Sequence, residues 1–155
     1  MKKRILSLLI LLSAATATMA YNSILAKLVK TDYEGKADSL TKVFIKEFMN
    51  TSKGTFWVTP KGVNSSNTYI YWQQAHAIDV VIYAYQRNLA AGNKTQANLY
   101  KNYVSKWFQN KGNNYSGGST GFENPYTDDM CWIALTLQRM GEVFNNNTYF
   151  STAKK

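Results

Sequence analysis

This 155-residue chain contains one cysteine and one histidine, and both shortages exclude classes of site. The single cysteine, Cys131, cannot form an intramolecular disulfide, so the fold must be held by packing alone. Because a free cysteine usually behaves as a small buried hydrophobe, we place Cys131 in the core. The single histidine, His76, stands in no cluster of potential metal ligands, and we predict neither a catalytic metal nor a cofactor. No nucleophile motif indicates a Ser-His-Asp triad.

Long hydrophobic runs are also scarce, and the one notable run lies at the N-terminus. Residues 2–4 are basic, residues 5–12 are apolar, and small residues follow up to Ala20. The apolar run is far too short to cross a bilayer, so the pattern predicts a secretory signal peptide over residues 1–20. No cysteine lies near the cleavage site, so we do not expect a bacterial lipid anchor. We therefore expect residues 21–155 to be exported, periplasmic or secreted, with no membrane association after signal removal.

Positive charge is spread along the chain rather than concentrated. The formal net charge is +9, and loss of the three basic residues of the signal peptide lowers it to +6. No Arg-rich run occurs, so we interpret the basic residues as a solvated surface and expect no nucleic-acid partner. The abundance of Tyr, Trp, Phe and Asn suits carbohydrate, because aromatic faces stack on sugar rings and amides bond to hydroxyls. It equally suits an ordinary core.

Helical spacing of apolar residues predicts an all-α fold. The first and third helices are apolar on one face, whereas the second and fourth are apolar nearly all round, which is typical of helices buried on both sides. This order of outer, inner, outer and inner helices is typical of helical hairpins wrapped into a barrel. A fifth helix, capped by Thr148, begins near the end. The four main helices are predicted at residues 32–49, 72–91, 95–110 and 128–144.

The connections between these helices differ in length. The two long, aromatic-rich loops, over residues 51–71 and 111–126, both lead into inner helices, whereas the short turn over residues 90–94 leads into an outer one. Inner helices in such a barrel are parallel, so their N-termini share one rim. Long loops are often functional. Trp72 and Asp128 are therefore expected at the same elaborated rim.

Two adjacent carboxylates, Asp128 and Asp129, occupy the first turn of the fourth helix, with Thr127 as its expected N-cap. Acidic residues in a first turn also favour the helix dipole, so the pair suits a simple helix start as well. A close carboxylate pair can hydrolyse a glycosidic bond, with one residue as nucleophile and the other as acid. Repulsion between close carboxylates raises one pKa, which keeps the acid protonated.

Three residues of the second helix allow two interpretations each. Trp72 suits stacking on a sugar or closing the core. His76 suits a pocket lining or a hydrogen-bonded structural role. Asp79, buried as a charge, would need a structural partner or a sugar hydroxyl.

Two segments carry a resemblance to a known family. They are Tyr71-Trp72-Gln73-Gln74-Ala75-His76-Ala77-Ile78-Asp79 and Asn124-Pro125-Tyr126-Thr127-Asp128-Asp129-Met130-Cys131-Trp132. They resemble glycoside hydrolase family 76, the endo-α-1,6-mannanases, and the similarity extends from about Tyr33 to the end of the chain. Many members have Glu after the acidic pair and a double tryptophan, where this chain has Met130 and the single Trp132.

The resemblance implies an (α/α)6 barrel that cleaves α-1,6-linked mannan with retention of configuration. It implies that Asp128 is the nucleophile and Asp129 the acid/base, and that the partner is an α-mannan polysaccharide or oligosaccharide. The candidate substrate-binding residues are Trp72, Gln73, His76, Asp79 and Tyr126.

Length is the main departure from the family. The barrel has six hairpins and this chain supplies about two, so residues 21–155 resemble the N-terminal part of the domain. We expect weak or no activity from the chain alone, with the missing C-terminal part of the barrel as a further partner. The alternatives are a non-catalytic mannan-binding module and a secreted helical interaction protein.

Overall fold

The computed structural model describes residues 32–63, 71–114 and 121–155. The predicted signal peptide and parts of both long loops lie outside these residues. The chain divides into two units, residues 1–38 and 39–155. In the first unit the described residues are helical, and the Lys36 ammonium lies 2.6 Å from the Asp32 carboxylate one turn away on an exposed surface. All further elements belong to the second unit.

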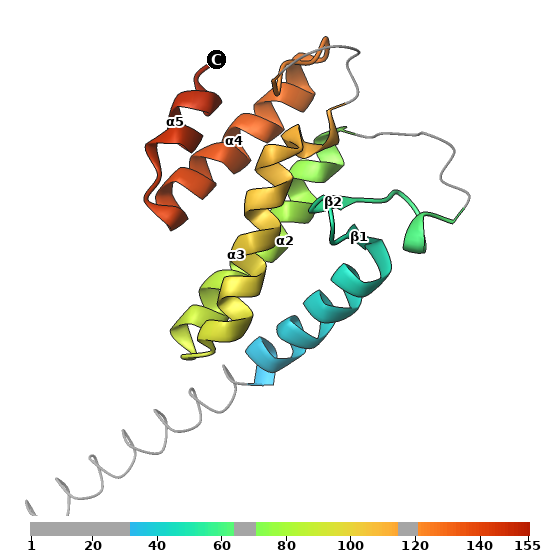
Figure 1. Ribbon diagram of the computed structural model, residues 1–155, viewed down its shortest axis with the longest axis vertical. Coiled ribbons are helices and arrows are strands. Elements are labelled where there is room, and N and C mark those ends of the chain that lie inside the picture. The colour runs from blue at the N-terminus through green and yellow to red at the C-terminus, as the bar shows by residue number, and fades with distance from the viewer. Residues whose placement is uncertain (1–31, 64–70, 115–120) are drawn as a thin grey trace, which may run out of the picture. The chain divides into compact units, whose positions relative to one another are not determined.

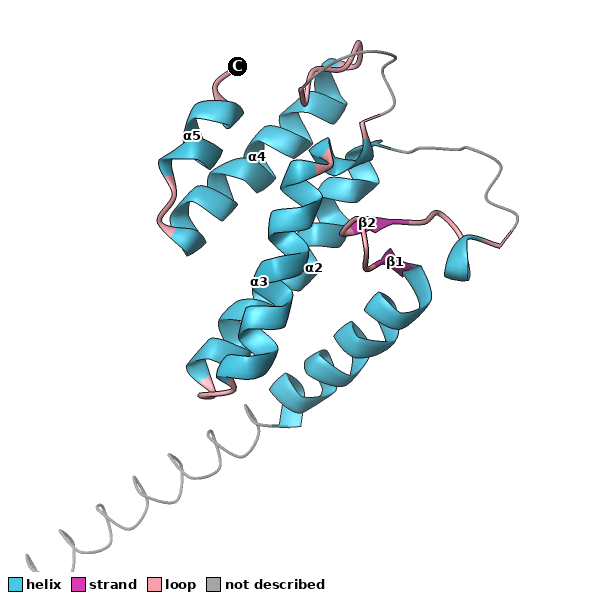
Figure 2. Ribbon diagram, viewed as in Figure 1, coloured by secondary structure: helices cyan, strands magenta, loops and turns pink. Residues whose placement is uncertain are grey.

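The second unit is mostly helical, which confirms the predicted all-α class (Figures 1 and 2). A helix over residues 32–48 leads into it, and each of the four predicted main helices is present within one or two residues of its expected bounds. Within the described residues, no helix is long and apolar enough to cross a membrane. The remaining elements are β1 (Met49–Asn50), β2 (Thr55–Phe56), the 3-10 turn η1 (Pro60–Gly62), α2 (Tyr71–Ala90), α3 (Lys94–Gln109), the 3-10 turn η2 (Lys111–Asn113), α4 (Thr127–Phe144) and α5 (Asn147–Ala153).

The turn between α2 and α3 is specified by Gly92. This residue has a φ of 78°, a conformation that glycine adopts without steric cost. The Gly92 N–H donates to the Leu89 carbonyl at 3.1 Å, and the Asn93 N–H donates to the Asn88 carbonyl at 2.8 Å. Together these bonds form a Schellman motif, which satisfies the last carbonyls of α2 and reverses the chain.

A small antiparallel hairpin occupies the start of the first long connection, where the sequence predicted no strand. Met49 pairs with Phe56, and Asn50 pairs with Thr55. The Asn50 side chain closes the turn by accepting hydrogen bonds from the backbone N–H groups of Ser52 and Lys53, both at 3.2 Å. This local asparagine bond competes with helix continuation, so the first helix ends at residue 48 rather than 49.

The hairpin is fixed to α3 and α2 by side-chain hydrogen bonds to its backbone. Lys106 of α3 donates to the Thr51 carbonyl, and Asn110 donates to the Lys53 carbonyl, both at 2.9 Å. On the other side, the buried amide of Gln74 accepts from the Phe56 N–H at 3.0 Å and donates to the Phe56 carbonyl at 2.7 Å. Gln74 thus bonds to β2 as a neighbouring strand would.

The core is built around α2, which packs against both α3 and α4. Eight of the 20 residues of α2 and six of the 18 residues of α4 are buried, against four of 16 in α3. In the helix over 32–48, Thr41 and Ile45 are the buried residues. The second and fourth helices are therefore more buried than the first and third, as predicted. The largest fully buried side chains include Trp107, Tyr71, Tyr100, Ile78, Ile82, Ile133, Leu137 and Met140.

Helices α2 and α4 run parallel, because their contacts rise together along both sequences. Ala75 accepts a hydrogen bond from Thr136, Asp79 pairs with Arg139, and the rings of Tyr85 and Phe144 lie 4.9 Å apart. The N-termini of α2 and α4 consequently lie at the same end, as Figure 1 shows. This is the shared end that the loop lengths predicted, and we call it the rim.

Three local predictions are wrong. Thr127 was predicted to cap α4, but Tyr126 holds the N-cap position and Thr127 is the first helical residue. Thr148 was predicted to cap α5, but the cap is Asn146, whose side chain accepts a hydrogen bond from the Thr148 N–H at 2.9 Å. Cys131 is exposed rather than buried. It lies in the first half of α4, and the short helix α5 packs against the second half, where a Cβ on Gly141 would lie 2.7 Å from the Phe150 ring.

Candidate active site

The two carboxylates of the first turn of α4 occupy different environments. Asp128 is exposed, whereas Asp129 exposes 6% of its surface. Successive helical residues are rotated by about 100°, so a helix lying against α2 turns one carboxylate inward and the next outward. The pair is therefore asymmetric before any ligand binds.

The segment before α4 is held by two asparagine side chains. The Asn114 amide donates to the carbonyls of Gly121 at 3.1 Å and Glu123 at 2.6 Å. The Asn124 amide donates to Asn114 Oδ1 at 3.4 Å, and its own Oδ1 accepts from the Tyr126 N–H at 2.9 Å. These bonds set where α4 begins, although the Tyr126 side chain makes no capping bond. The sequence analysis did not single out Asn114, and it missed the role of Asn124.

Tyr71 lies under this segment and is almost completely buried. Its hydroxyl donates to the Phe122 carbonyl at 3.1 Å, which ties the first residue of α2 to the approach to α4. Burial, and next the negative charge of Asp129, raise the pKa of Tyr71, so the hydroxyl stays protonated. The sequence analysis used Tyr71 only as part of a motif.

Burial raises the pKa of Asp129 above its ordinary value, and the neighbouring charge of Asp128 raises it further. Both causes favour the protonated carboxylic acid at Asp129. Glycoside hydrolysis requires two carboxyl groups of which one holds its proton more tightly than the other, and Asp129 is the one of this pair whose pKa is raised.

Three aromatic rings form a continuous strip across α2 and α4. The rings of Trp72 and His76 meet edge to face with centroids 5.6 Å apart, and the rings of His76 and Trp132 lie 4.6 Å apart. The two tryptophans are 41% and 44% exposed, and His76 is exposed as well. The structure thus brings Trp72 and His76, which the sequence placed in the site, together with Trp132, which it placed only in the motif and which lies one turn beyond Asp128.

A cavity of about 390 Å³ lies on one side of this strip. Trp72, Gln73 and His76 line it together with aromatic and aliphatic residues. Neither Asp128 nor Asp129 is among its lining residues. Three of the four predicted substrate-binding residues on α2 therefore share a cavity that the carboxylates do not enter, and Asp79 does not line it. The other lining residues are Phe44, Phe48, Phe56, Trp57, Val58, Gln74, Ala77 and Val80.

Asp79 has a structural partner, so the structural interpretation of this residue holds. Its carboxylate forms an ion pair with Arg139 of α4, and the Arg139 guanidinium lies 5.4 Å from the centre of the Tyr83 ring. The hydrogen bond to Asp79 raises the pKa of Arg139, more than burial lowers it. Arg139, a residue not singled out from the sequence, joins α2 and α4 below the rim.

Tyr126 is exposed at the N-cap position and makes no side-chain capping bond. It stands next to the carboxylates in sequence, but it lines neither the 390 Å³ cavity nor a second cavity of about 490 Å³. Among the described residues, no group of three His, Cys, Asp or Glu side chains lies close enough to hold a metal ion.

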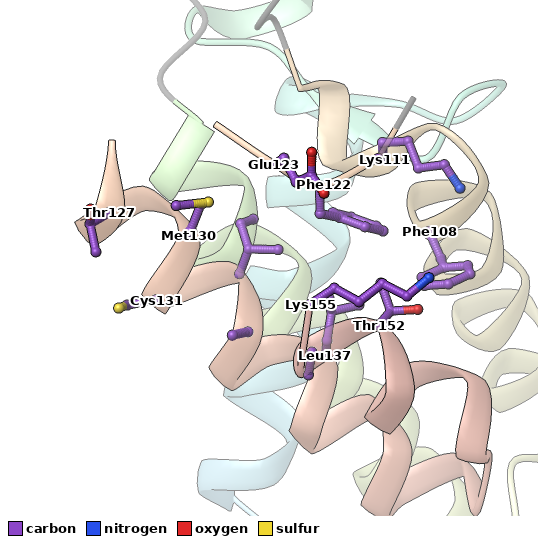
Figure 3. Close-up of a pocket in the computed structure, with 14 residues that line it drawn as sticks. Phe108, Lys111, Phe122, Glu123, Thr127, Met130, Cys131, Leu137, Thr152 and Lys155 are labelled. Carbon is purple, nitrogen blue, oxygen red and sulfur yellow. The ribbon is translucent and has the colours of Figure 1, made fainter. Parts of the chain in front are cut away.

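A second cavity, of about 490 Å³, lies on the opposite side of α4 (Figure 3). Phe108 and Phe122 form one wall, Met130 and Cys131 of α4 form another, and Lys155 lies near the end of α5. The lining is mostly apolar and includes neither Asp128 nor Asp129. This cavity lies along the part of α4 that the short helix α5 does not cover.

Comparison of the chain with protein-family models, curated proteins and solved structures found no match of any of the three kinds.

Proposed function

We propose that this chain is the N-terminal part of an exported glycoside hydrolase that cleaves α-1,6-linked mannan with retention, as its resemblance to family 76 implies. The observation that carries the proposal is the asymmetric carboxylate pair at the rim. Asp128 is exposed and Asp129 is buried, and both stand in the first turn of a helix that runs parallel to α2.

The roles of the two carboxylates follow from their surroundings. Asp128 is exposed in the first turn of α4, so a sugar can reach the carboxylate that would act as the nucleophile. Asp129 is the acid/base, because burial and the charge of Asp128 favour retention of its proton until the leaving oxygen accepts it. The glycosidic oxygen must then approach the small exposed part of Asp129.

The aromatic strip supports a sugar as the ligand. Exposed tryptophan faces on α2 and α4 offer apolar surfaces for sugar rings, and Trp132 places one such face within a helical turn of Asp128. Gln73 and His76 add hydrogen-bonding groups beside Trp72 in the 390 Å³ cavity.

The order of outer and inner helices supports the barrel. α2 and α4 are the more buried and are parallel, and α5 begins another outer position against α4. We propose that these elements form about two of the six hairpins of an (α/α)6 barrel. The other hairpins would supply the far wall of the cleft, so the chain alone is expected to have weak or no activity.

Mannan binding without cleavage is the second candidate function. The exposed rings of Trp72 and Trp132 favour it, because stacking on a sugar requires no opposite wall. In that case the Asp128–Asp129 pair is a helix start and contributes nothing to turnover.

Titration of the chain with linear α-1,6-mannooligosaccharides, followed by NMR and by product analysis, tests both candidates. Binding that perturbs Trp72 and Trp132 signals supports a mannan site, and no binding at millimolar ligand contradicts it. In a chain that carries the remaining hairpins, we expect cleavage with retention, and Asp128→Asn should abolish formation of the glycosyl-enzyme. Unchanged cleavage by an Asp128→Asn/Asp129→Asn variant would contradict the assignment of the pair.

A further inference from the structure

We propose that Tyr71 is a positioning residue for Asp129, because its buried hydroxyl anchors the segment that delivers the carboxylate pair to the rim. The reaction in which Asp129 would act rests on the function proposed above. The positioning itself is a property of this chain and is measurable without any substrate.

The geometry gives Tyr71 a role beyond filling the core. It is the first residue of α2, it exposes 1% of its surface, and its hydroxyl donates to the Phe122 carbonyl at 3.1 Å. This bond spans 51 residues of sequence and joins the start of α2 to the approach to α4. A buried hydroxyl that makes such a bond resists displacement, because the carbonyl would otherwise lose its partner.

Phe122 is in turn fixed by its ring. The Phe122 ring lies 5.7 Å from the Trp107 ring and 5.4 Å from the Phe108 ring, both on α3. The Asn114 amide holds the carbonyls on either side of it, at Gly121 and Glu123. Tyr71 therefore adds a link from this segment to α2, the helix that packs against α4.

Asp129 and Tyr71 also act on each other electrostatically. Burial raises the pKa of Tyr71, and the charge of Asp129 raises it further. The other ionisable group that acts on Asp129 is Asp128, on the same helix. Lys111 of η2 and Glu123 of the segment before α4 are charged residues that line the 490 Å³ cavity, whose lining includes neither Asp128 nor Asp129.

Loss of the Tyr71 hydroxyl should change the proton affinity of Asp129. Tyr71→Phe keeps the ring but removes a buried polar group on which the charge of Asp129 acts, so the surroundings of Asp129 become less polar. The pKa of Asp129 should therefore rise further, by about half a pH unit or more. The backbone amides of residues 122–126 should also exchange faster with deuterium, because their link to α2 is lost.

The experiment is a carboxyl-carbon NMR titration of the whole chain with Asp129 assigned, together with hydrogen exchange. Tyr100→Phe is the matched control, since Tyr100 also exposes 1% of its surface but lies on α3. We expect Tyr71→Phe to raise the Asp129 midpoint and Tyr100→Phe to leave it in place. An unchanged midpoint in Tyr71→Phe, or an equal change in both variants, overturns the proposal.

A second substitution keeps the test decisive if Tyr71→Phe does not fold. Difluorotyrosine at position 71 retains the ring and the hydroxyl but makes the hydroxyl a stronger donor to the Phe122 carbonyl, so the amides of residues 122–126 should exchange more slowly. Exchange that becomes faster or does not change overturns the positioning role. A chain that passes these tests but neither binds nor cleaves mannan would refute the proposed function and leave the positioning of Asp129 intact.

Discussion

Asp79 of α2 and Arg139 of α4 form an ion pair that joins these two parallel helices below the rim. Their side chains are 17% and 32% exposed, so the pair is partly shielded from water. Asp79 Oδ1 is buried and has no hydrogen-bond partner within the described residues. The guanidinium is therefore the group that compensates the Asp79 charge.

Arg139→Met should destabilise the chain by about 1–3 kcal/mol, because it leaves the Asp79 carboxylate shielded and uncompensated. Adding Asp79→Asn should restore part of the loss, since the remaining amide carries no charge. Urea unfolding measures both free energies. Lys36→Met, which breaks the exposed Asp32–Lys36 pair, is the control and should change stability by no more than about 0.5 kcal/mol. Equal effects at the two sites would contradict this account.

Gln74 offers a test of the link between β2 and α2. Gln74→Leu removes the partners of both backbone groups of Phe56, which are buried. The expected loss is about 2 kcal/mol or more, because each orphaned group costs on the order of 1–3 kcal/mol. Gln73→Leu, at the adjacent half-buried position, should stay within about 0.5 kcal/mol of the parent in the same thermal or urea unfolding measurement. A loss at Gln73 that matched the loss at Gln74 would refute the strand-like role of the Gln74 amide.

Two glycines with similar backbone angles separate conformational strain from crowding. Gly54 and Gly92 have φ values of 74° and 78°. A Cβ at Gly92 would meet no atom within 4 Å, whereas one at Gly54 would lie 2.6 Å from the backbone of both Trp107 and Tyr103. Gly92→Ala should therefore cost about 1–2 kcal/mol, and Gly54→Ala at least about 2 kcal/mol more. Similar unfolding free energies for the two variants would show that the hairpin tip moves freely away from α3.

Much of the fold was predictable because helical periodicity is a strong local signal. The four main helices lie within one or two residues of their predicted bounds. The lengths of the connections correctly predicted that the N-termini of α2 and α4 lie at the same end. The hairpin at β1 and β2 was missed, because its strands have two residues each and depend on Gln74, Lys106 and Asn110, which are distant in sequence.

The candidate site was predictable in its residue types but not in its contacts. Asp128, Asp129 and Trp72 were identified from a motif and its position at the rim. The burial of Asp129 depends on how α4 rotates against α2, which no local pattern specifies. The pairing of Asp79 with Arg139 likewise depends on the register between two helices that are joined through a third.

Exposed apolar residues on α2 and α4 should make the chain self-associate. Val80 and Tyr83 of α2 and Trp132 and Leu135 of α4 are all more than a third exposed, and such surfaces usually mark an interface or promote aggregation. Trp132→Gln/Leu135→Gln should weaken self-association by about tenfold, as measured by light scattering across a concentration series. The control is Leu99→Gln, which alters an exposed leucine on α3 and should have little effect. A parent chain that remains monomeric at high concentration would refute this prediction.

Asp129 should lower the stability of the chain at neutral pH. Its folded-state pKa is raised above the ordinary value of 3.8, mainly by burial, so the native state holds this proton more tightly than the unfolded state. The stabilisation is therefore present at low pH and is lost as the pH rises from about 3.8 through the raised pKa. Asp129→Asn cannot ionise, so it should be more stable than the parent at pH 7, with the gain developing over that pH range and then levelling off.

Asp128→Asn separates the two causes of this pKa change. Removing the Asp128 charge eliminates the smaller cause and leaves burial, so the pKa of Asp129 should fall part of the way toward 3.8. Urea unfolding at a series of pH values, with the Asp129 carboxyl followed by NMR, measures both quantities. If Asp129→Asn were no more stable than the parent at pH 7, burial would not disfavour the Asp129 carboxylate. The main reason for assigning the acid role to Asp129 rather than Asp128 would then be lost.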